Sequence, residues 1–530
     1  MTGSAHSRSK KVLMIGLDGA DPALLEQGMD QGRLPNLRRL RTQGTYGRIA
    51  STAEWLTSSV WPSFLTGMPP GEHGGYHYLQ WRAERMQFQR WDSEWIPLIP
   101  FWRALSKAGP RVITLDVPAA DTPQGFDGIE LSDWGALPQI RGPSAYPARM
   151  SAWVTQRYGA SLHRMSRELS HELFAPQRME RLLAQADLFV TSTRRMAEVA
   201  AALLREEPWD LFISVISAAH RGGHELWDAS GVSDGDGPEV ERRLRDALWR
   251  TYAACDEAVG RHLEAVGASA TVLVFGLHGM TANTSRSDLL DPMLRRIVDG
   301  TASRTASAKP GALTRLRRLV PDEWRMSLKS RLPLDLQDRL SVFWRAGSRN
   351  WATTRAFPLT ADVDGYVRIN LRGREAAGTV EPGAEYEDLC RRIAEGMRSF
   401  IDADTGEPIV DDMAFSDSCF PGSPRRNDLP DLIVRWRPTP AARHRQLVSP
   451  RFGALDWRTP GKMPNGRSGN HNANGFLLAV GDGITAGSSL SGGHILDLPP
   501  TVYALFDLSA PSHMTGRPIR EVTSTGARVS

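Results

Sequence analysis

Short apolar runs that alternate with helical stretches are the feature that most constrains the fold of this chain. The runs cover 11–17, 111–115, 209–217 and 270–276, and apolar residues recur at helical spacing over 179–205 and 238–266. A short apolar run between helices is typical of a strand buried on both faces of a parallel sheet. The alternation therefore predicts an α/β protein with a doubly wound sheet.

Polar residues stand at the ends of these runs, where open α/β sheets collect their ligands. Asp18 follows the first run, His220 and His224 the third, and His278 the fourth, while His471 lies in a late Gly-Asn-His motif. His220 and His224 are four residues apart, so one helical turn would place both imidazoles on the same side of a site. Single histidines are more often core or surface residues, but this group favours a zinc-like ion.

The stretch from Leu56 to Gly74, LTSSVWPSFLTGMPPGEHG, carries a cluster of hydroxyls at a predicted loop-to-helix junction. A hydroxyl in this position lies among unpaired backbone N–H groups at the positive end of the helix dipole. That setting suits a nucleophile that attacks an anionic ester. An ordinary helix N-cap is the alternative interpretation.

Composition limits the function classes. A formal net charge of +4 is small for 530 residues and gives no sign of a nucleic-acid polymer as partner. The three cysteines are far apart and form no CxxC pair, which argues against a disulfide framework or a thiolate zinc site. No apolar run suits a signal peptide or approaches the roughly 20 residues of a membrane span. We expect a soluble, cytoplasmic protein without a membrane partner; the sequence leaves the oligomeric state open.

Residues 284–350 break the alternation and are rich in Arg and Lys. We expect a basic helical insertion or cap there, either as a solvated face or as a surface that steers an anionic substrate. Residues 10–283 and 351–530 are expected to form the catalytic domain, and the polar residues 1–9 to be disordered. The region from Pro138 to His171 has no clear periodicity and is expected to be irregular.

Several motifs together resemble the alkaline phosphatase superfamily. They are GLDG at 16–19, the hydroxyl stretch, GGHELW at 222–227, HGM at 278–280, GNH at 469–471, the block 369–389 and LDLPPTVYALFDL at 496–508. Within the superfamily, the chain is most similar to the type I phosphodiesterase/nucleotide pyrophosphatase branch, which includes bacterial predicted phosphohydrolases and phosphomutases. The resemblance implies a three-layer α/β/α fold with a mostly parallel sheet and a cap.

The resemblance also implies a two-metal site with a hydroxyl nucleophile. Counting back from Thr66-Gly67 places Thr57 at the nucleophile position, with Ser58 as the substitute if the register slips by one. The implied metal ligands are Asp18, Thr57 and His278 at one site, and His220, His224 and His471 at the other. The implied enzyme is a metal-dependent hydrolase of an anionic small-molecule phosphate ester, acting through a covalent phospho-enzyme on Thr57. A phosphodiester or pyrophosphate is slightly favoured over a monoester. One or two zinc ions are expected, with manganese or iron as alternatives.

Two positions depart from the family pattern, because His220 and Leu277 stand where the family usually has Asp. Leu277 cannot bind a metal, so Asp18 is the only carboxylate among the implied ligands. Three outcomes stay open: an oxygen of Asn283, Asp116 or Asp133 fills in, a single ion binds to three histidines, or a non-catalytic phosphate- or partner-binding protein keeps the fold.

Two other enzymes of the superfamily are less well matched. Thr57-Ser-Ser-Val-Trp61 lacks the C/S-x-P-x-R element of sulfatases, and no extra motif indicates a phosphomutase, which ranks second. Among nearby residues, His73 is expected to be structural. Four aromatic residues either stack on a leaving group or simply pack: Tyr76, Tyr78, Trp81 and Trp91.

Overall fold

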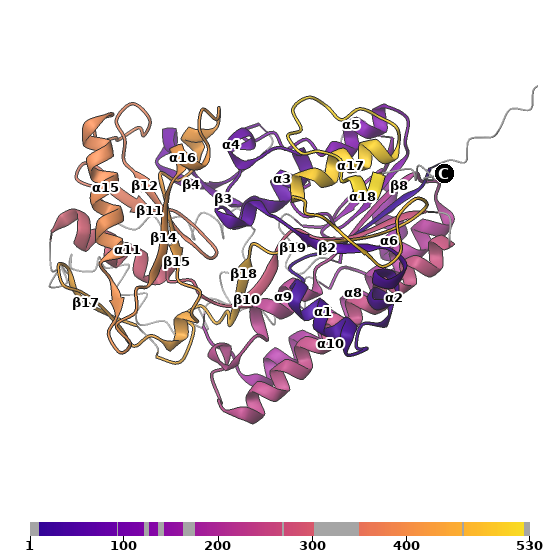
Figure 1. Cartoon of the computed structure of the whole chain (residues 1–530), viewed down its shortest axis with the longest axis horizontal. Helices are drawn as coiled ribbons and strands as arrows, with labels where there is room; N and C mark the ends of the chain where they lie inside the picture. Colours follow the sequence, from indigo (N-terminus) through magenta and orange to yellow (C-terminus); the bar gives the residue numbers. More distant parts are fainter. Residues whose placement is uncertain are drawn as a thin grey trace, which may run out of the picture.

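The computed structural model of the chain describes residues 10–523 apart from 93, 121–126, 136–141, 163–174, 268–269, 301–348 and 458–459. The expected disorder of residues 1–9 therefore concerns residues outside the described part. Two lobes lie side by side, one built on a large sheet and one on smaller antiparallel sheets (Figure 1). None of the described helices combines the length and apolar composition needed to cross a membrane.

The large sheet has nine strands in the order β20-β2-β19-β9-β1-β8-β5-β6-β7. Its parallel centre consists of β9 (Thr271–Gly276), β1 (Val12–Leu17), β8 (Leu211–Ile216), β5 (Val112–Leu115) and β6 (Gly128–Ser132). The outer strands are β19 (Gly475–Val480), β2 (Thr45–Ile49), β20 (Ser488–Ser489) and β7 (Ser144–Tyr146). β19 and β7 run antiparallel to their inner neighbours. This topology confirms the predicted mostly parallel α/β sheet.

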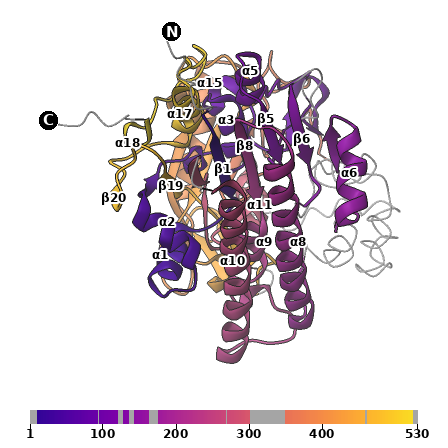
Figure 2. The same cartoon turned by 90° about the vertical axis from the view of Figure 1, so that its right-hand side faces the viewer.

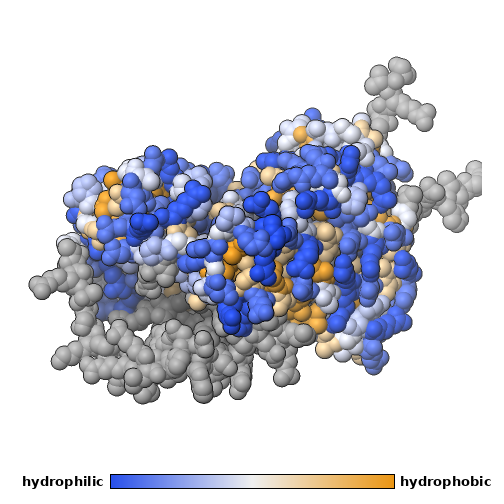
Figure 3. All heavy atoms as spheres, turned by 90° about the horizontal axis from the view of Figure 1, so that it is seen from below, coloured by the Kyte–Doolittle hydropathy of each residue, from blue (hydrophilic) through white to orange (hydrophobic). Residues whose placement is uncertain are grey.

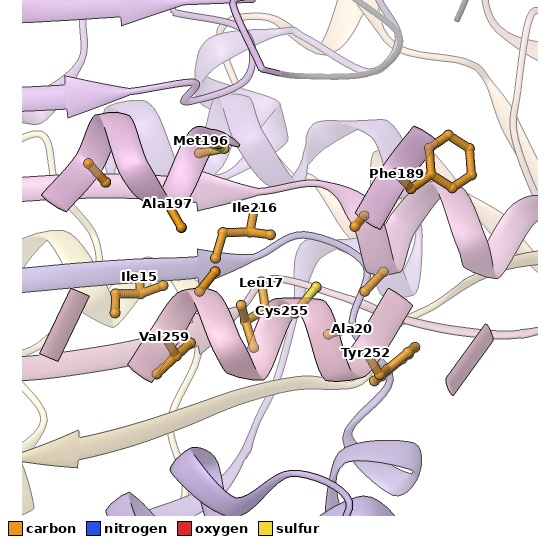
Figure 4. Packing of buried hydrophobic residues seen from close by; sticks show 14 of the residues in the cluster. Ile15, Leu17, Ala20, Phe189, Met196, Ala197, Ile216, Tyr252, Cys255 and Val259 are labelled. Carbon is orange, nitrogen blue, oxygen red and sulfur yellow. The ribbon is translucent and has the colours of Figure 1, made fainter. Parts of the chain in front are cut away.

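Helices cover both faces of this sheet. One face carries α1 (Pro22–Asp30), α2 (Pro35–Gln43), α8 (Met179–Glu206) and α10 (Pro238–Val266). Figure 2 shows α8 and α10 lying side by side in front of the strands. The other face carries α3 (Val60–Thr66), α5 (Phe101–Lys107) and α17 (Leu498–Leu505). Because side chains alternate along a strand, Ile15 and Leu17 enter the first core (Figure 4) and Met14 enters the second.

One helix of this lobe lies where the sequence indicated an irregular region. α6 (Arg149–Tyr158) buries only Met150 and Val154. Two apolar residues one turn apart give a narrow apolar stripe, which is too weak a pattern to predict a helix.

On the side of the lobe seen in Figure 3, hydrophilic residues alternate with small apolar areas.

The second lobe has its own sheet and core. Its four strands are β11 (Ala356–Pro358), β12 (Gly365–Ile369), β15 (Leu432–Trp436) and β14 (Val410–Phe415), all antiparallel to their neighbours. The helices α11 (Ser287–Asp299) and α15 (Ala384–Arg398) pack on it, and β13 (Ile401–Asp402), β16 (Gln446–Ser449) and β17 (Gly453–Asp456) form a further sheet. Of the expected basic insertion at 284–350, α11 belongs to this core, and residues 301–348 lie outside the described part.

A few short elements connect the lobes. β10 (Gly279–Ala282) pairs antiparallel with β18 (Gly469–Asn472), which sets His471 opposite Met280. α9 (Ala218–Glu225) follows β8, and the hairpin β3 (Leu79–Arg82) and β4 (Gln87–Arg90) follows α4 (Pro70–His73). In Figure 1, β10, β18 and α9 lie between the two lobes.

Candidate metal centre

The candidate site forms where three neighbouring parallel strands end. Asp18 follows β1, His278 follows β9, and α9 begins two residues after β8, so His220 and His224 lie one turn apart on it. These strands are adjacent in the sheet, so their carboxyl ends meet at one edge. The pairing of β18 with β10 brings His471 to the same place. Five predicted site residues, distant in sequence, are thereby assembled.

Their side chains contact one another. Nδ1 of His220 lies 2.6 Å from Oδ2 of Asp18, and Nε2 of His220 lies 3.0 Å from Nε2 of His224. Nε2 of His278 is 3.4 Å from Oδ1 of Asp18, and Nδ1 of His471 is 3.1 Å from Nδ1 of His278. The ligand atoms of His220, His224 and His471 all lie within 4.8 Å of one another.

This donor set fits a divalent metal ion. Two nitrogens bound to one tetrahedral zinc at roughly 2.0–2.1 Å would lie about 3.3 Å apart, close to the 3.0 Å between Nε2 of His220 and Nε2 of His224. Burial, followed by Arg467, His471 and His220, lowers the pKa of His224 well below its usual value. Burial, His278 and His220 lower the pKa of His471 in the same direction. Neutral imidazole is the form that binds metals, so the surroundings favour ligation.

Groups behind the cluster hold two of its members. The Nδ1–H of His224 donates to the backbone oxygen of Gly469 at 3.0 Å, which leaves Nε2 for the site. The indole N–H of Trp61 donates to Oδ1 of Asp18 at 3.1 Å. Burial raises the pKa of Asp18, but the neighbouring His220 and His278 outweigh it and hold that pKa well below its ordinary value. Asp18 is therefore an anion ready to bind a cation.

Thr57 lies at the start of a short helical segment beside this cluster. It is buried and opens the 3₁₀ turn η2 (Thr57–Ser59), which α3 continues. Trp61 stands one turn after Thr57, so its hydrogen bond to Asp18 ties the hydroxyl-bearing segment to the site. The predicted junction of loop and helix is present, and Trp61 links the segment that follows it to Asp18.

The family model for type I phosphodiesterases/nucleotide pyrophosphatases matches residues 12–433, most of the chain. The chain belongs to this family. Membership places it among the hydrolases of phosphoric esters and confirms the resemblance found in the sequence.

Several solved structures are similar to the chain at low sequence identity. Human ectonucleotide pyrophosphatase/phosphodiesterase 5 is 12% identical with a TM-score of 0.48, over 96% of this chain and 97% of that one. The murine counterpart, solved in complex with AMP, is 11% identical with a TM-score of 0.48, over 95% and 96%. Phosphonoacetate hydrolase from Sinorhizobium meliloti 1021, solved with phosphonoformate, is 13% identical with a TM-score of 0.48, over 95% and 96%. No curated protein matches the chain.

The structure shows what replaces the usual Asp of the family at position 277. The side chain of Leu277 is buried in the same hydrophobic core as Trp61, Phe64 and Phe275. Its backbone oxygen accepts a hydrogen bond of 2.6 Å from the Ser51 hydroxyl. Position 277 therefore contributes to packing.

The three residues suggested as substitutes for the missing carboxylate have other hydrogen-bond partners. Asp116 accepts the backbone N–H groups of Trp134 and Gly135 at 2.8 and 2.7 Å. Asp133 accepts the N–H of Gly142 at 3.0 Å. Asn283 Oδ1 accepts from the Ser285 N–H at 2.9 Å and from the Asn470 amide at 3.2 Å. These contacts give all three side chains roles in loop structure.

A carboxylate that the sequence analysis did not single out lies beside the site. Asp362, from the second lobe, accepts a hydrogen bond from the Ser58 hydroxyl through Oδ2. Its Oδ1 lies 3.7 Å from Nη1 of Arg467 and 4.0 Å from Nε2 of His77. Burial raises its pKa, but His77, Arg467, His471 and Ser58 outweigh burial and hold the pKa far below its usual value. The only sequence signal is an Asp-Val-Asp-Gly turn before a strand, which is common in loops.

Most of the nearby aromatic residues pack. Tyr76, Trp81 and Trp91 are buried, whereas Tyr78 is 42% exposed and stacks against His77 with ring centroids 4.4 Å apart. His73 is buried and contacts the Ser63 hydroxyl at 3.0 Å, consistent with its expected structural role. Tyr78 is thus the member of the set that is not buried.

Proposed function

We propose that the protein hydrolyses an anionic phosphate ester, with a diester or pyrophosphate favoured, through Thr57 and a metal centre at Asp18, His220, His224, His278 and His471. The observation that carries the proposal is the meeting of four imidazoles and Asp18 beside the segment that Thr57 begins. Membership in the type I phosphodiesterase/nucleotide pyrophosphatase family supports the reaction class.

The residues divide the work as follows. The Thr57 oxygen attacks phosphorus and its proton passes to solvent. The bond from phosphorus to the leaving oxygen breaks, this oxygen takes up a proton from solvent, and the phosphoryl group is held on Thr57. A water molecule then attacks phosphorus and releases Thr57, so one water is consumed for each ester bond broken. Divalent ions bound at the site would lower the pKa of the attacking oxygens and offset the charge on the phosphoryl oxygens. Four imidazoles and one carboxylate suit zinc better than manganese, which favours oxygen ligands.

A second candidate function follows from Leu277. The loss of a metal-binding carboxylate favours a descendant of the fold that binds a phosphate compound without turning it over. This candidate keeps the histidine cluster as a binding site. It differs from the first in needing no reaction at Thr57.

Turnover of bis-p-nitrophenyl phosphate tests the proposal. Protein stripped with a chelator and reloaded with zinc or manganese should hydrolyse the diester, and Thr57→Ala should lower kcat by about 10³-fold or more. Thr57→Ser, which keeps a hydroxyl at the same position, should retain part of the activity. Bound metal without turnover under either ion would contradict hydrolysis and favour the binding protein.

A further inference from the structure

The second lobe restores part of the negative charge that the metal centre lacks. His220 and Leu277 both stand where the family usually has Asp, which leaves Asp18 as the only carboxylate among the proposed ligands. Asp362 is a further carboxylate against this site, and its side chain is only 18% exposed. A charge that is mostly withdrawn from water acts strongly on its neighbours.

Contacts on both sides fix Asp362 next to the reacting groups. Its Oδ2 accepts from the hydroxyl of Ser58, the residue after the proposed nucleophile. Its backbone oxygen accepts from the Asn470 side chain at 2.7 Å, and Asn470 precedes the proposed ligand His471. The Asp362 carboxylate therefore stands at the wall of the site between the Thr57 segment and β18.

The two cations nearest the Asp362 carboxylate lie at a distance from it. The Arg467 guanidinium lies 3.7 Å from Oδ1 and His77 lies 4.0 Å away, both beyond normal hydrogen-bond length. The carboxylate therefore adds a negative field that these cations only partly offset. A structural ion pair would instead have its oxygens fully used, as Asp431 does with Arg374 at 2.7 Å.

We propose that Asp362 determines which phosphate esters the site accepts, by disfavouring a dianionic phosphoryl group relative to a monoanionic one. A phosphomonoester carries two negative charges above its second pKa of roughly 6, whereas a phosphodiester carries one. A fixed negative charge in the wall repels the dianion more strongly. The inference rests on the proposed function and assigns the discrimination between singly and doubly charged phosphoryl groups to one residue. Asp362 acts on specificity and takes no part in bond making.

The test compares two substrates with the same leaving group, p-nitrophenyl phosphate and bis-p-nitrophenyl phosphate, at about pH 8, where the monoester is a dianion. Asp362→Asn should raise the ratio of monoester to diester kcat/KM by about tenfold or more, because it removes one unit charge and keeps the shape. Asp364→Asn is the matched control, since Asp364 is a second buried carboxyl two residues away, and burial and Arg435 set its environment. The ratio for this variant should stay within about twofold of the wild type.

Arg467→Gln changes the charge beside the site in the opposite direction, because it removes a positive charge instead of a negative one. Removing the guanidinium should lower the monoester-to-diester ratio, whereas general damage to the site would move both variants the same way. Calorimetric titration of the metal-loaded protein with inorganic phosphate provides a measurement that needs no turnover. Asp362→Asn should bind phosphate about tenfold tighter and Arg467→Gln more weakly.

The outcomes separate the two proposals. An unchanged substrate ratio in Asp362→Asn with full metal content, or a shift in the same direction for both variants, would overturn the role of Asp362 alone. If the wild type hydrolyses neither ester, the proposed function fails. The phosphate titration then decides the charge effect by itself: unchanged affinity in Asp362→Asn would overturn it.

Discussion

Nδ1 of His220 lies 2.6 Å from Asp18, while its Nε2 lies 3.0 Å from His224. One imidazole therefore contacts a proposed ligand of each metal site. Position 220 is also where the family usually has a carboxylate. The bridging position explains why a histidine can stand there: both ring nitrogens face a partner, and neither requires the negative charge of Asp to do so.

This relationship predicts that His220 matters to both ions. His220→Ala should weaken metal binding by more than about 100-fold, beyond the roughly 10–100-fold loss typical of residues that only support a ligand. His220→Asp, which restores the usual residue, should keep its metal. Chelator competition with elemental analysis measures both. Equal affinities for His220→Ala and the wild type would rule out His220 as a ligand.

The two sites should also respond separately to substitution. Protein purified without chelator should hold about two ions per chain if both sites are occupied. His278→Ala should then lower the content toward one, and His224→Ala should do so through the other ion. A content near one that His278→Ala leaves unchanged would show that the Asp18 site is empty and that a single ion binds to the three-histidine group.

A substitution at Leu277 tests whether a carboxylate at this position could bind metal. Leu277→Asp places a charge in a hydrophobic core and should lower the free energy of unfolding of metal-free protein by about 3–5 kcal/mol. If the new carboxylate reaches the Asp18 site, zinc should stabilise this variant more than it stabilises the wild type. Leu277→Asn is the control of equal size without charge. Thermal unfolding with and without zinc measures the effect, and equal responses of the two variants would exclude a metal site reaching position 277.

The buried carboxyl group of Asp364 should make the free energy of unfolding depend on pH. Burial raises the pKa of Asp364 to about 7, and Arg435 only partly opposes the shift. The folded state then keeps a proton that the unfolded state releases above about pH 4, so stability should fall as pH rises from about 4 to about 7. Asp364→Asn should remove this fall in stability and raise the free energy of unfolding by up to about 4 kcal/mol at about pH 8. Urea unfolding at several pH values measures it; parallel pH profiles of variant and wild type would contradict the assignment.

Much of the first lobe could be predicted from the sequence because its signals are local. The buried strands β1, β8 and β9 are continuous apolar runs, and the predicted helix at 238–266 coincides with α10. Four residues of the candidate site were predictable for the same reason, since they follow those strands. Asp18, His220, His224 and His278 could therefore be placed at one sheet edge without any knowledge of the packing.

The second lobe and the position of Asp362 could not be predicted in this way, because they depend on contacts between residues far apart in the sequence. The strand at 366–370 was predicted, but its membership in a second antiparallel sheet is set by pairing with residues more than 60 positions away. Asp362 belongs to a turn with no periodic pattern, and its importance arises only when the second lobe packs against Ser58 and Arg467. The spacing of residues in the sequence does not indicate such a contact.

The most direct test of the account is to identify the residue that becomes modified during turnover. An excess of metal-loaded protein is mixed with bis-p-nitrophenyl phosphate, quenched in acid within the first turnover, digested and mapped by mass spectrometry. We predict a p-nitrophenylphosphoryl group on Thr57, absent from Thr57→Ala and present in Asp364→Asn. Turnover with no modified residue, or this group on Ser58 in place of Thr57, would contradict the account.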